Sequence, residues 1–256
     1  MANPWLGIPL EDYEGHMTLP DVGQLPVLAE LFRCALEYCR PESVAVLGIA
    51  GGNGLEHIDC SVTERIVGVD INPRYLDEVR RRFGALAGLE LHCCDLTERN
   101  FSFAPVAMVH AALIFEHAGM DTALENALAL VAPGGNLSVV LQLPGVAEQG
   151  VASTRYASMQ SLKRDFVLID KGEVRRLLGL KGFKVVREEN RSLPAGKAFW
   201  LGVFAQGGLD PYSSRSAEAG SMPAARIAGE RFAIRATMHS TAGAIAKVTA
   251  SVGLMP

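Results

Sequence analysis

Short apolar runs alternate with amphipathic segments along most of the chain, which is typical of an α/β protein. The apolar runs predict strands over 44–49, 66–70, 89–96, 106–110, 137–143, 183–189 and 199–205. Apolar residues at helical spacing predict helices over 21–40, 73–83, 121–131 and 171–180. Residues 1–20 show neither period and are expected to be irregular. Because strands and helices alternate, we expect a mostly parallel sheet with helices on both faces.

A glycine-rich turn follows the first apolar run, and a helix-compatible segment follows the turn. Small residues take every second position, at Gly48, Ala50, Gly52 and Gly54. Glycine has no Cβ and tolerates positive φ, so such a turn brings bare backbone close to a ligand. The next run ends at Asp70, and in doubly wound folds an acid at this place reaches the ribose of a nucleotide. The pattern therefore predicts an enzyme with a nucleoside cofactor.

Two interpretations of the turn compete. The dinucleotide fingerprint G-x-G-x-x-G requires glycine at positions 48, 50 and 53, and the chain has Gly48, Ala50 and Asn53 there. Only one position fits, which argues against a nicotinamide dehydrogenase.

The alternate spacing resembles motif I of the class I S-adenosylmethionine-dependent methyltransferases, (D/E)-x-G-x-G-x-G. Gly52 and Gly54 match the motif, whereas Ala50 replaces its first glycine. Gly48 replaces the acid, which in that family helps to hold the methionine end of the cofactor. The run Val131-Ala132-Pro133-Gly134-Gly135 resembles the family's L-x-P-G-G turn into strand five. The resemblance covers about residues 43–142.

The resemblance implies a Rossmann-like, doubly wound, seven-stranded sheet that closes with an antiparallel hairpin. We expect an N-terminal lid segment and helix over 1–42, the methyltransferase core over 43–206 and an Ala/Gly/Ser-rich extension over 207–256, with weak helices near 224–237 and 241–251. The implied cofactor is S-adenosyl-L-methionine. Its predicted contacts are Gly48, Ile49, Ala50, Gly52, Gly54, Asp70, Ile71, Asp95, Leu96, His110 and Ala111.

Methyl transfer from a sulfonium is an in-line displacement, and the cofactor already carries the activated methyl group. The enzyme aligns the acceptor and excludes water, and it needs a base only where the acceptor must lose a proton. The run Leu113-Ile114-Phe115-Glu116-His117 resembles the "hxxEH" element of small-molecule methyltransferases. A histidine titrates near neutrality, and His117 and His16 are the candidate catalytic residues. The alternative role for His117 is to orient the loop beside the cofactor.

The segment 5–17 combines aromatic residues with a histidine and a methionine ahead of a helix. Class I enzymes often fold such a segment over the cofactor as a lid, and lids exclude water. The predicted substrate-side residues are Tyr13, His16, Met17, Gln24, Gln142 and Tyr156. Gln24 is also a candidate for the amino-acid end of the cofactor. Arg155, Lys163 and Arg164 either favour an anionic acceptor or are merely exposed.

Composition limits the kinds of partner and ligand that the chain is expected to bind. The formal net charge of −4 gives no basic footprint, which argues against nucleic acid. Five cysteines show no zinc spacing, and no metal site is expected. No apolar run approaches a membrane span and no secretory signal is present, so a cytoplasmic protein is expected, as a monomer or homodimer.

The sequence therefore predicts methyl transfer from S-adenosylmethionine to a small-molecule acceptor. The alternative is a methyltransferase-like protein without catalysis that binds the cofactor or a partner. The substitutions at Gly48 and Ala50 motivate that alternative.

Overall fold

The computed structural model describes residues 3–98, 103–145 and 150–207. The chain divides into two units, Met1–Gly207 and Gly208–Pro256, and the described residues all belong to the first. The predicted lid segment and helix over 1–42 are part of the first unit. The predicted weak helices of the extension lie outside the described residues. No helix among the described residues combines the length and apolar character that crossing a bilayer requires.

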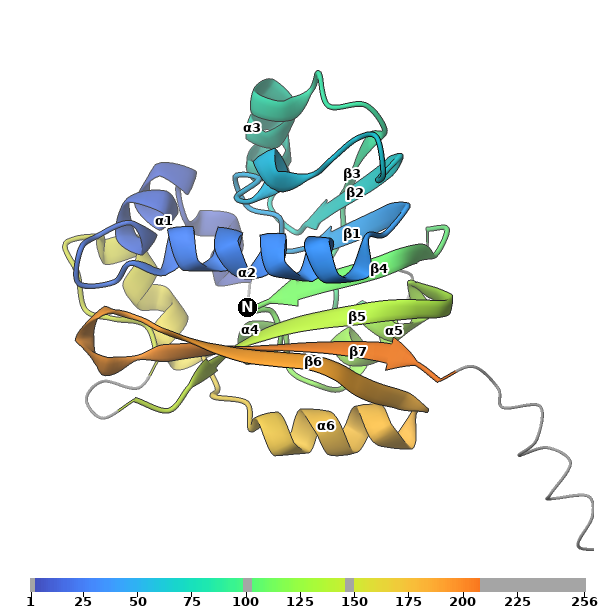
Figure 1. Ribbon diagram of the computed structural model, residues 1–256. Coiled ribbons are helices and arrows are strands. Elements are labelled where there is room, and N and C mark those ends of the chain that lie inside the picture. Colours follow the sequence, from blue (N-terminus) through green and yellow to red (C-terminus); the bar gives the residue numbers. More distant parts are fainter. Residues whose placement is uncertain (1–2, 99–102, 146–149, 208–256) are drawn as a thin grey trace, which may run out of the picture. The chain divides into compact units, whose positions relative to one another are not determined.

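Seven strands form one sheet in the order β3-β2-β1-β4-β5-β7-β6 (Figure 1). Their bounds are β1 Ser43–Leu47, β2 Arg65–Asp70, β3 Leu89–Cys93, β4 Val106–Ala112, β5 Val131–Leu143, β6 Phe183–Ser192 and β7 Ala198–Gln206. The pairs from β3 to β5 are parallel, and β7 is antiparallel to both β5 and β6. The predicted mostly parallel sheet with an antiparallel closing hairpin is confirmed.

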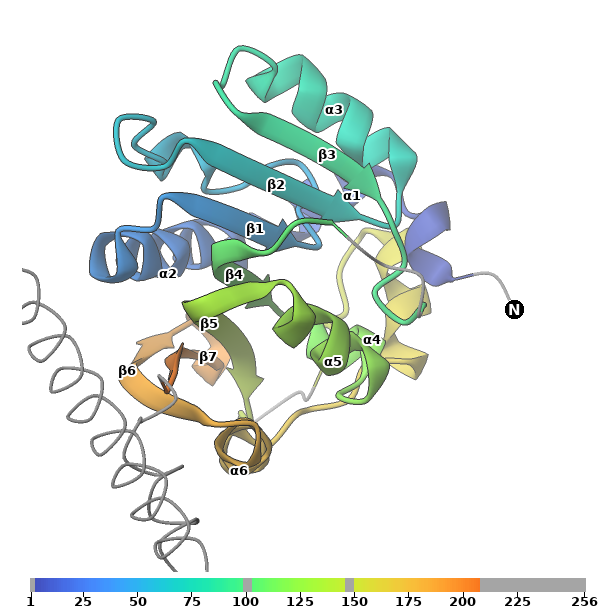
Figure 2. The same ribbon diagram turned by 90° about the vertical axis from the view of Figure 1, so that its right-hand side faces the viewer.

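Helices cover both faces of the sheet. The helices are α1 Leu10–Met17, α2 Gln24–Cys39, α3 Pro73–Phe83, α4 Phe115–Ala118, α5 Thr122–Ala129 and α6 Lys171–Leu180. One core cluster joins α2 and α3 to the sheet through residues such as Phe32, Val79 and Val46. The other joins α5 and α6 through residues such as Leu124, Val174 and Trp200. Figure 2 shows α2 on one side of the strands and α5 on the other. The central strands are buried from both faces, which explains their unbroken apolar runs.

Local sequence sets the ends of several helices. Asn72 begins α3, because its side-chain oxygen accepts a hydrogen bond from the backbone nitrogen of Arg74 (3.1 Å). Pro73 follows at the first helical position, where its missing N–H is harmless. Asp170 begins α6 in the same way by accepting from the nitrogen of Glu173 (2.9 Å). Pro26 lies in the first turn of α2, as the sequence predicts.

Three segments differ from what their sequence patterns suggest. The helix-compatible segment after the glycine-rich turn forms no α-helix, since residues 48–64 contain only the 3-10 turn Leu55–His57. Four glycines precede that turn, and Asp59 then binds the backbone nitrogen (2.9 Å) and hydroxyl (2.6 Å) of Ser61, which favours a turn over a helix.

The N-terminal segment contains helical structure where none was expected. The 3-10 helix Pro4–Gly7 and the helix α1 lie within residues 1–20. Glu11 and Asp12 stand in the first turn of α1, where negative charge favours a helix. The Pro-Gly-Gly segment also differs, because it lies inside β5 as a bulge and not before it. Val131 pairs with Val106, but Asn136 pairs with Met108, and the extra residues are accommodated by Gly134 at φ +77°.

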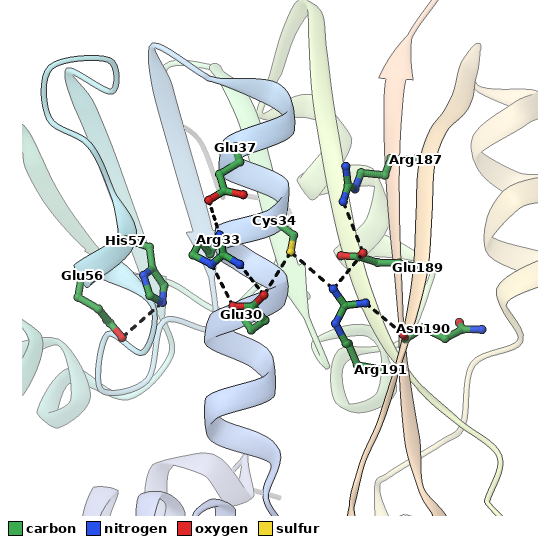
Figure 3. Close-up of polar contacts among 10 residues, drawn as sticks. All are labelled: Glu30, Arg33, Cys34, Glu37, Glu56, His57, Arg187, Glu189, Asn190 and Arg191. Atoms are coloured by element: carbon green, nitrogen blue, oxygen red, sulfur yellow. Dashed lines mark hydrogen bonds and ion pairs between the residues drawn. The ribbon is translucent and has the colours of Figure 1, made fainter.

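A polar network links α2 to the closing hairpin (Figure 3). Glu189 of β6 pairs with Arg191 (3.1 Å) and Arg187 (3.5 Å), and Arg191 reaches the sulfur of Cys34 on α2 (3.9 Å). On α2, Arg33 pairs with Glu30 and Glu37. Such partly exposed pairs contribute little individually. None of these residues lines the cavity described next, so the network supports the scaffold and not the site.

Candidate active site

A cavity opens where the parallel strands end. It encloses about 1170 Å³ of empty space, its open mouth included. Gly48, Asp70, Ala112 and Gln142 line it from the carboxyl ends of β1, β2, β4 and β5. The strand order reverses between β1 and β4, and ligands of open α/β sheets bind at such a switch point. The cavity therefore occupies the place where this architecture binds ligands.

Most of the residues predicted from sequence line this cavity. They are Tyr13, His16, Met17, Gln24, Gly48, Ala50, Asp70, Ile71, Asp95, Leu96, His117 and Gln142. The structure thus brings together lid, glycine-rich turn and strand ends, which are far apart in sequence.

Six predicted residues do not line the cavity. His110 is buried under α2, where its Nδ1 lies 3.0 Å from the Ser138 hydroxyl and its ring packs on Phe32. Ala111 points to the opposite face and joins the core there. Ile49 is also in the core. His110 and Ala111 are neighbours on β4, so their side chains point to opposite faces of the sheet. The cavity lies at the ends of the strands and not on either face.

The other three are displaced by local packing. Gly52 and Gly54 pack against the rings of Phe83 and Phe32. Tyr156 lies against Gly15 of α1. Arg155, Lys163 and Arg164 are exposed and do not line the cavity, so the structure supports their interpretation as surface charge.

Asp70 is held in one orientation by backbone donors. Its Oδ2 accepts from the nitrogen of Ala50 and its Oδ1 from the nitrogen of Asn72, both at 2.9 Å. Burial raises the pKa of this carboxyl, and the backbone hydrogen bonds oppose that shift. Each carboxylate oxygen can accept more than one hydrogen bond. Asp70 therefore faces the cavity with a fixed geometry and remaining acceptor capacity.

Three residues around the cavity have left-handed backbone conformations. Gly48 has φ +66°, and the non-glycine residues Ala50 and Leu113 have φ +46° and φ +56°. Such conformations cost free energy in residues with a Cβ and cluster at ligand sites. All three residues line the cavity. The chain therefore changes direction beside the cavity where β1 and β4 end.

The N-terminal segment is fastened over the cavity by side chains of the β2–α3 corner. Asn72 donates to the carbonyl of Trp5 (2.9 Å), Tyr75 donates to that of Ile8 (3.0 Å), and Arg74 donates to that of Leu6. The helix α1 is fastened on its other side, because Ser158 donates to Asp12 (2.6 Å). Figure 1 shows α1 beside the yellow segment that carries the 3-10 helix Ala157–Arg164. The N-terminal segment therefore forms part of the cavity wall, and its role as a lid stays a prediction.

Comparison with known proteins identifies the central part of this unit. Residues 44–135 match the sequence model of a family described as Methyltransferase domain. The matched segment runs from β1 into β5 and contains the glycine-rich turn, Asp70 and Asp95. This segment is a class I methyltransferase domain. Such domains take the methyl group from S-adenosylmethionine, so the family inferred from the motifs is confirmed.

Solved structures share the fold of the methyltransferase domain and its flanking elements. The N-methyltransferase NodS from Bradyrhizobium japonicum WM9, in complex with S-adenosyl-L-homocysteine, is 15% identical with a TM-score of 0.56, over 80% of this chain and 99% of that one. The 1,6-didemethyltoxoflavin-N1-methyltransferase from Burkholderia thailandensis is 17% identical with a TM-score of 0.57, over 77% and 84%.

A third structure limits what the fold implies. The [4+2]-cyclase SpnF is 12% identical with a TM-score of 0.55, over 70% of this chain and 82% of that one. At these identities the likeness concerns the fold alone, and a fold can carry more than one chemistry. No curated protein matches the chain.

Burial favours the neutral form of both candidate catalytic histidines. Burial lowers the pKa of His117 to about 4, and Asp165 only partly opposes this. Burial and the nearby Lys197 lower the pKa of His16, whose Nδ1 lies 2.8 Å from the Thr154 hydroxyl. Each ring therefore offers one donor and one acceptor nitrogen. The role of either residue as a base stays a prediction.

Glu116 is a residue of the "hxxEH" element whose burial the sequence did not reveal. It is 1% exposed; its Oε1 accepts from the nitrogen of Gln142 (2.9 Å), while its Oε2 has no partner. Burial raises the pKa of this carboxyl from 4.5 to about 7. Its own backbone carbonyl accepts from the nitrogen of Val167 (2.9 Å). Glu116 thus joins the end of β5 to the segment that closes the far side of the cavity.

We expect Glu116→Gln to remove a pH dependence of stability. The folded protein keeps Glu116 protonated up to about pH 7, whereas the unfolded chain ionises it above about pH 4.5. Wild type therefore loses about 3 kcal/mol of stability from this group as pH rises through that window. Urea unfolding at pH 4.5 and pH 8 measures the change in the free energy of unfolding of each protein. Subtracting the change in the variant from that in wild type removes the contribution of the other titrating groups. Equal losses in the two proteins would contradict the burial of a protonated Glu116.

Other cavity residues were not predicted. Trp5, Tyr75, Ile114, Met159, Leu162 and Phe166 all line the cavity. Trp5 belongs to the aromatic lid segment and Ile114 to the "hxxEH" element, so a local sequence pattern pointed to the region of each. Phe166 and Met159 had none, because they reach the cavity only through tertiary packing.

Proposed function

We propose that this protein transfers a methyl group from S-adenosylmethionine to a small-molecule acceptor bound beside His117. The observation that carries the proposal is the oriented carboxylate of Asp70 in a lidded cavity at the switch point. When bound, the cofactor supplies the activated methyl group, and its sulfonium becomes a neutral thioether on transfer. The residues of this chain bind and orient the two reactants and exclude water.

The adenosine half of the cofactor fits the residues present. Asp70 has acceptor capacity for the two ribose hydroxyls. Asp95 follows β3 with its Oδ1 bonded to the nitrogen (2.8 Å) and hydroxyl (2.7 Å) of Thr97, and its carboxylate suits the adenine amino group. Leu96 and Ile71 supply apolar contacts at this end of the cavity. We therefore assign the adenosine to the ends of β2 and β3.

The methionine half needs a different arrangement from that of the family motif. Position 48 carries no acid, and an added Cβ there would lie 2.2 Å from Cδ1 of Ile114. Among the described residues, the amide of Gln24 makes no hydrogen bond, although Gln24 is only 7% exposed and lines the cavity. We assign the amino-acid end of the cofactor to Gln24 and to the backbone carbonyls of the strained turns.

Gln24→Met tests this assignment. Methionine keeps the length of the side chain and removes its polar groups. We expect S-adenosylhomocysteine to bind about ten-fold more weakly, which corresponds to roughly one lost hydrogen bond to a charged group. Binding of methylthioadenosine, which lacks the amino-acid end, should be unchanged in isothermal titration. Equal losses for both compounds would move the amino-acid end away from Gln24.

The lid residues complete the proposed reaction. Burial and the nearby Asp70 and Glu14 raise the pKa of the Tyr13 hydroxyl, so Tyr13 keeps its proton. Its hydroxyl can therefore donate a hydrogen bond to an anionic partner. His117 and Gln142 face the acceptor side. If the acceptor releases a proton on methylation, neutral His117 is the group placed to take it.

Isothermal titration with S-adenosylmethionine, S-adenosylhomocysteine and NAD in parallel tests the proposal. Binding of the first two alone supports methyl transfer. The absence of the motif I acid and of the helix after the glycine-rich turn favours, as a second candidate, a cofactor-binding or partner module without catalysis. A folded protein that binds none of the three compounds would support that second candidate.

A further inference from the structure

The charged side chains in the described wall of the cavity are all acidic. Asp70 and Asp95 are its carboxylates, and none of the described residues that line it is a lysine or arginine. Lys197 is not one of the lining residues, and its Nζ donates to the carbonyl of Gly150 (2.7 Å). A negatively charged acceptor would enter this cavity without a cationic side chain to pair with, which is unfavourable in a buried site.

Aromatic rings surround the acceptor end. The His117 ring meets Trp5 edge-on, with centroids 5.1 Å apart at 87°, and meets Phe166 at 5.3 Å and 73°. Met159 and Leu162 of the following segment line the same end. Aromatic rings pack favourably against a planar ring in offset or edge-to-face geometry. This wall therefore suits a flat, apolar body.

One polar atom is left without a partner in this apolar wall. Nδ1 of His117 is buried and makes no hydrogen bond with any described residue. A buried, unpaired polar atom destabilises the protein unless a ligand or water satisfies it. Because the His117 ring lines the cavity, a polar group on a bound molecule can hydrogen-bond to a nitrogen of this ring.

We infer that the acceptor is an uncharged aromatic compound whose hydroxyl or amino group hydrogen-bonds to His117. This inference rests on the proposed function, because it concerns the acceptor of the same site. The ring of the acceptor packs among Trp5, Phe166 and Met159, and its polar group pairs with the histidine nitrogen. The absence of lysine and arginine from the described wall selects against carboxylates and phosphates of the same shape.

Three probes with one two-ring body test the inference: β-naphthol, naphthalene and β-naphthoate. The first is uncharged at pH 7, since phenols ionise near pH ~10. Each is titrated calorimetrically into the full chain saturated with S-adenosylhomocysteine, which cannot donate a methyl group. We expect naphthol to bind about ten-fold more tightly than either naphthalene or naphthoate. Naphthalene lacks the hydrogen bond, and naphthoate carries a charge that would be buried without a partner.

His117→Phe then isolates the histidine nitrogen, because the ring and its edge contacts stay. We expect naphthol affinity to fall about ten-fold and naphthalene affinity to be unchanged. His57→Phe, on the 3-10 turn outside the cavity, is the matched control and should change neither. Phe166→Leu serves if His117→Phe no longer binds S-adenosylhomocysteine, and it should weaken naphthol and naphthalene alike.

The outcomes separate the two proposals. Failure of wild type to bind S-adenosylhomocysteine overturns the proposed function itself. With that compound bound, naphthoate binding as tightly as naphthol overturns the charge selection. Naphthol binding no better than naphthalene, or insensitive to His117→Phe, overturns the role of His117.

Discussion

Asp70→Asn is expected to weaken S-adenosylhomocysteine binding by about 100-fold or more. The carboxylate is proposed to accept hydrogen bonds from both ribose hydroxyls, and each hydrogen bond to a charged group contributes roughly 1.5–3 kcal/mol. Asparagine keeps one acceptor oxygen but turns an NH₂ group toward a backbone donor, either that of Ala50 or that of Asn72. The substitution therefore removes charge and also disturbs the orientation of the side chain.

Isothermal titration of wild type and variant with S-adenosylhomocysteine measures this loss. Adenosine should lose affinity by a similar factor, because it contains the same ribose. Asp77→Asn is the matched control, since Asp77 lies on α3 with an exposed side chain paired to Arg80. Thermal unfolding of both variants separates a folding defect from a binding defect. Wild-type affinity in a folded Asp70→Asn protein would place the ribose elsewhere.

The sequence was most informative where local pattern and tertiary position coincide. Buried parallel strands need apolar runs, so the strands were visible, and Asp70 stood out because it ends one of them. The ends of parallel strands meet at one edge of a sheet, which is why Gly48, Asp70 and Gln142 were correctly expected to lie together. This part of the site follows from topology alone.

The parts that were missed depend on contacts that no local pattern records. The segment after the glycine-rich turn is compatible with a helix in sequence, but the glycines and the Asp59 turn favour an irregular path. Phe166 reaches the cavity because Val167 is held by the carbonyl of Glu116, some fifty residues away along the chain. His110 has the residue type of a catalytic group, yet its strand position turns it into the core beneath Phe32. In each case tertiary packing, and not the local sequence, determines where the residues lie.

Gly48→Ala is expected to damage both stability and cofactor binding, although alanine is the smallest possible addition. Gly48 has φ +66°, which costs about 1–2 kcal/mol for a residue with a Cβ. The new Cβ would also lie 2.2 Å from Cδ1 of Ile114, so that side chain must move. Ile114 lines the cavity, and its displacement changes the space offered to the cofactor. Gly48→Asp, which restores the family acid, should therefore weaken S-adenosylhomocysteine binding and not improve it.

Two further variants separate the backbone cost from the steric cost. Gly182 has φ +82° with nothing within 4 Å of an added Cβ, so Gly182→Ala should show only the backbone cost in urea unfolding. Ile114→Val removes Cδ1, the atom that collides. In the double variant Gly48→Ala/Ile114→Val, we expect the cofactor affinity lost in Gly48→Ala to recover, with a favourable coupling of about 1 kcal/mol in stability. Additive effects would mean that Ile114 does not exclude a side chain at position 48, and the absence of the acid would then need another cause. A favourable coupling would instead show why this chain has to bind the methionine end of its cofactor through groups such as Gln24.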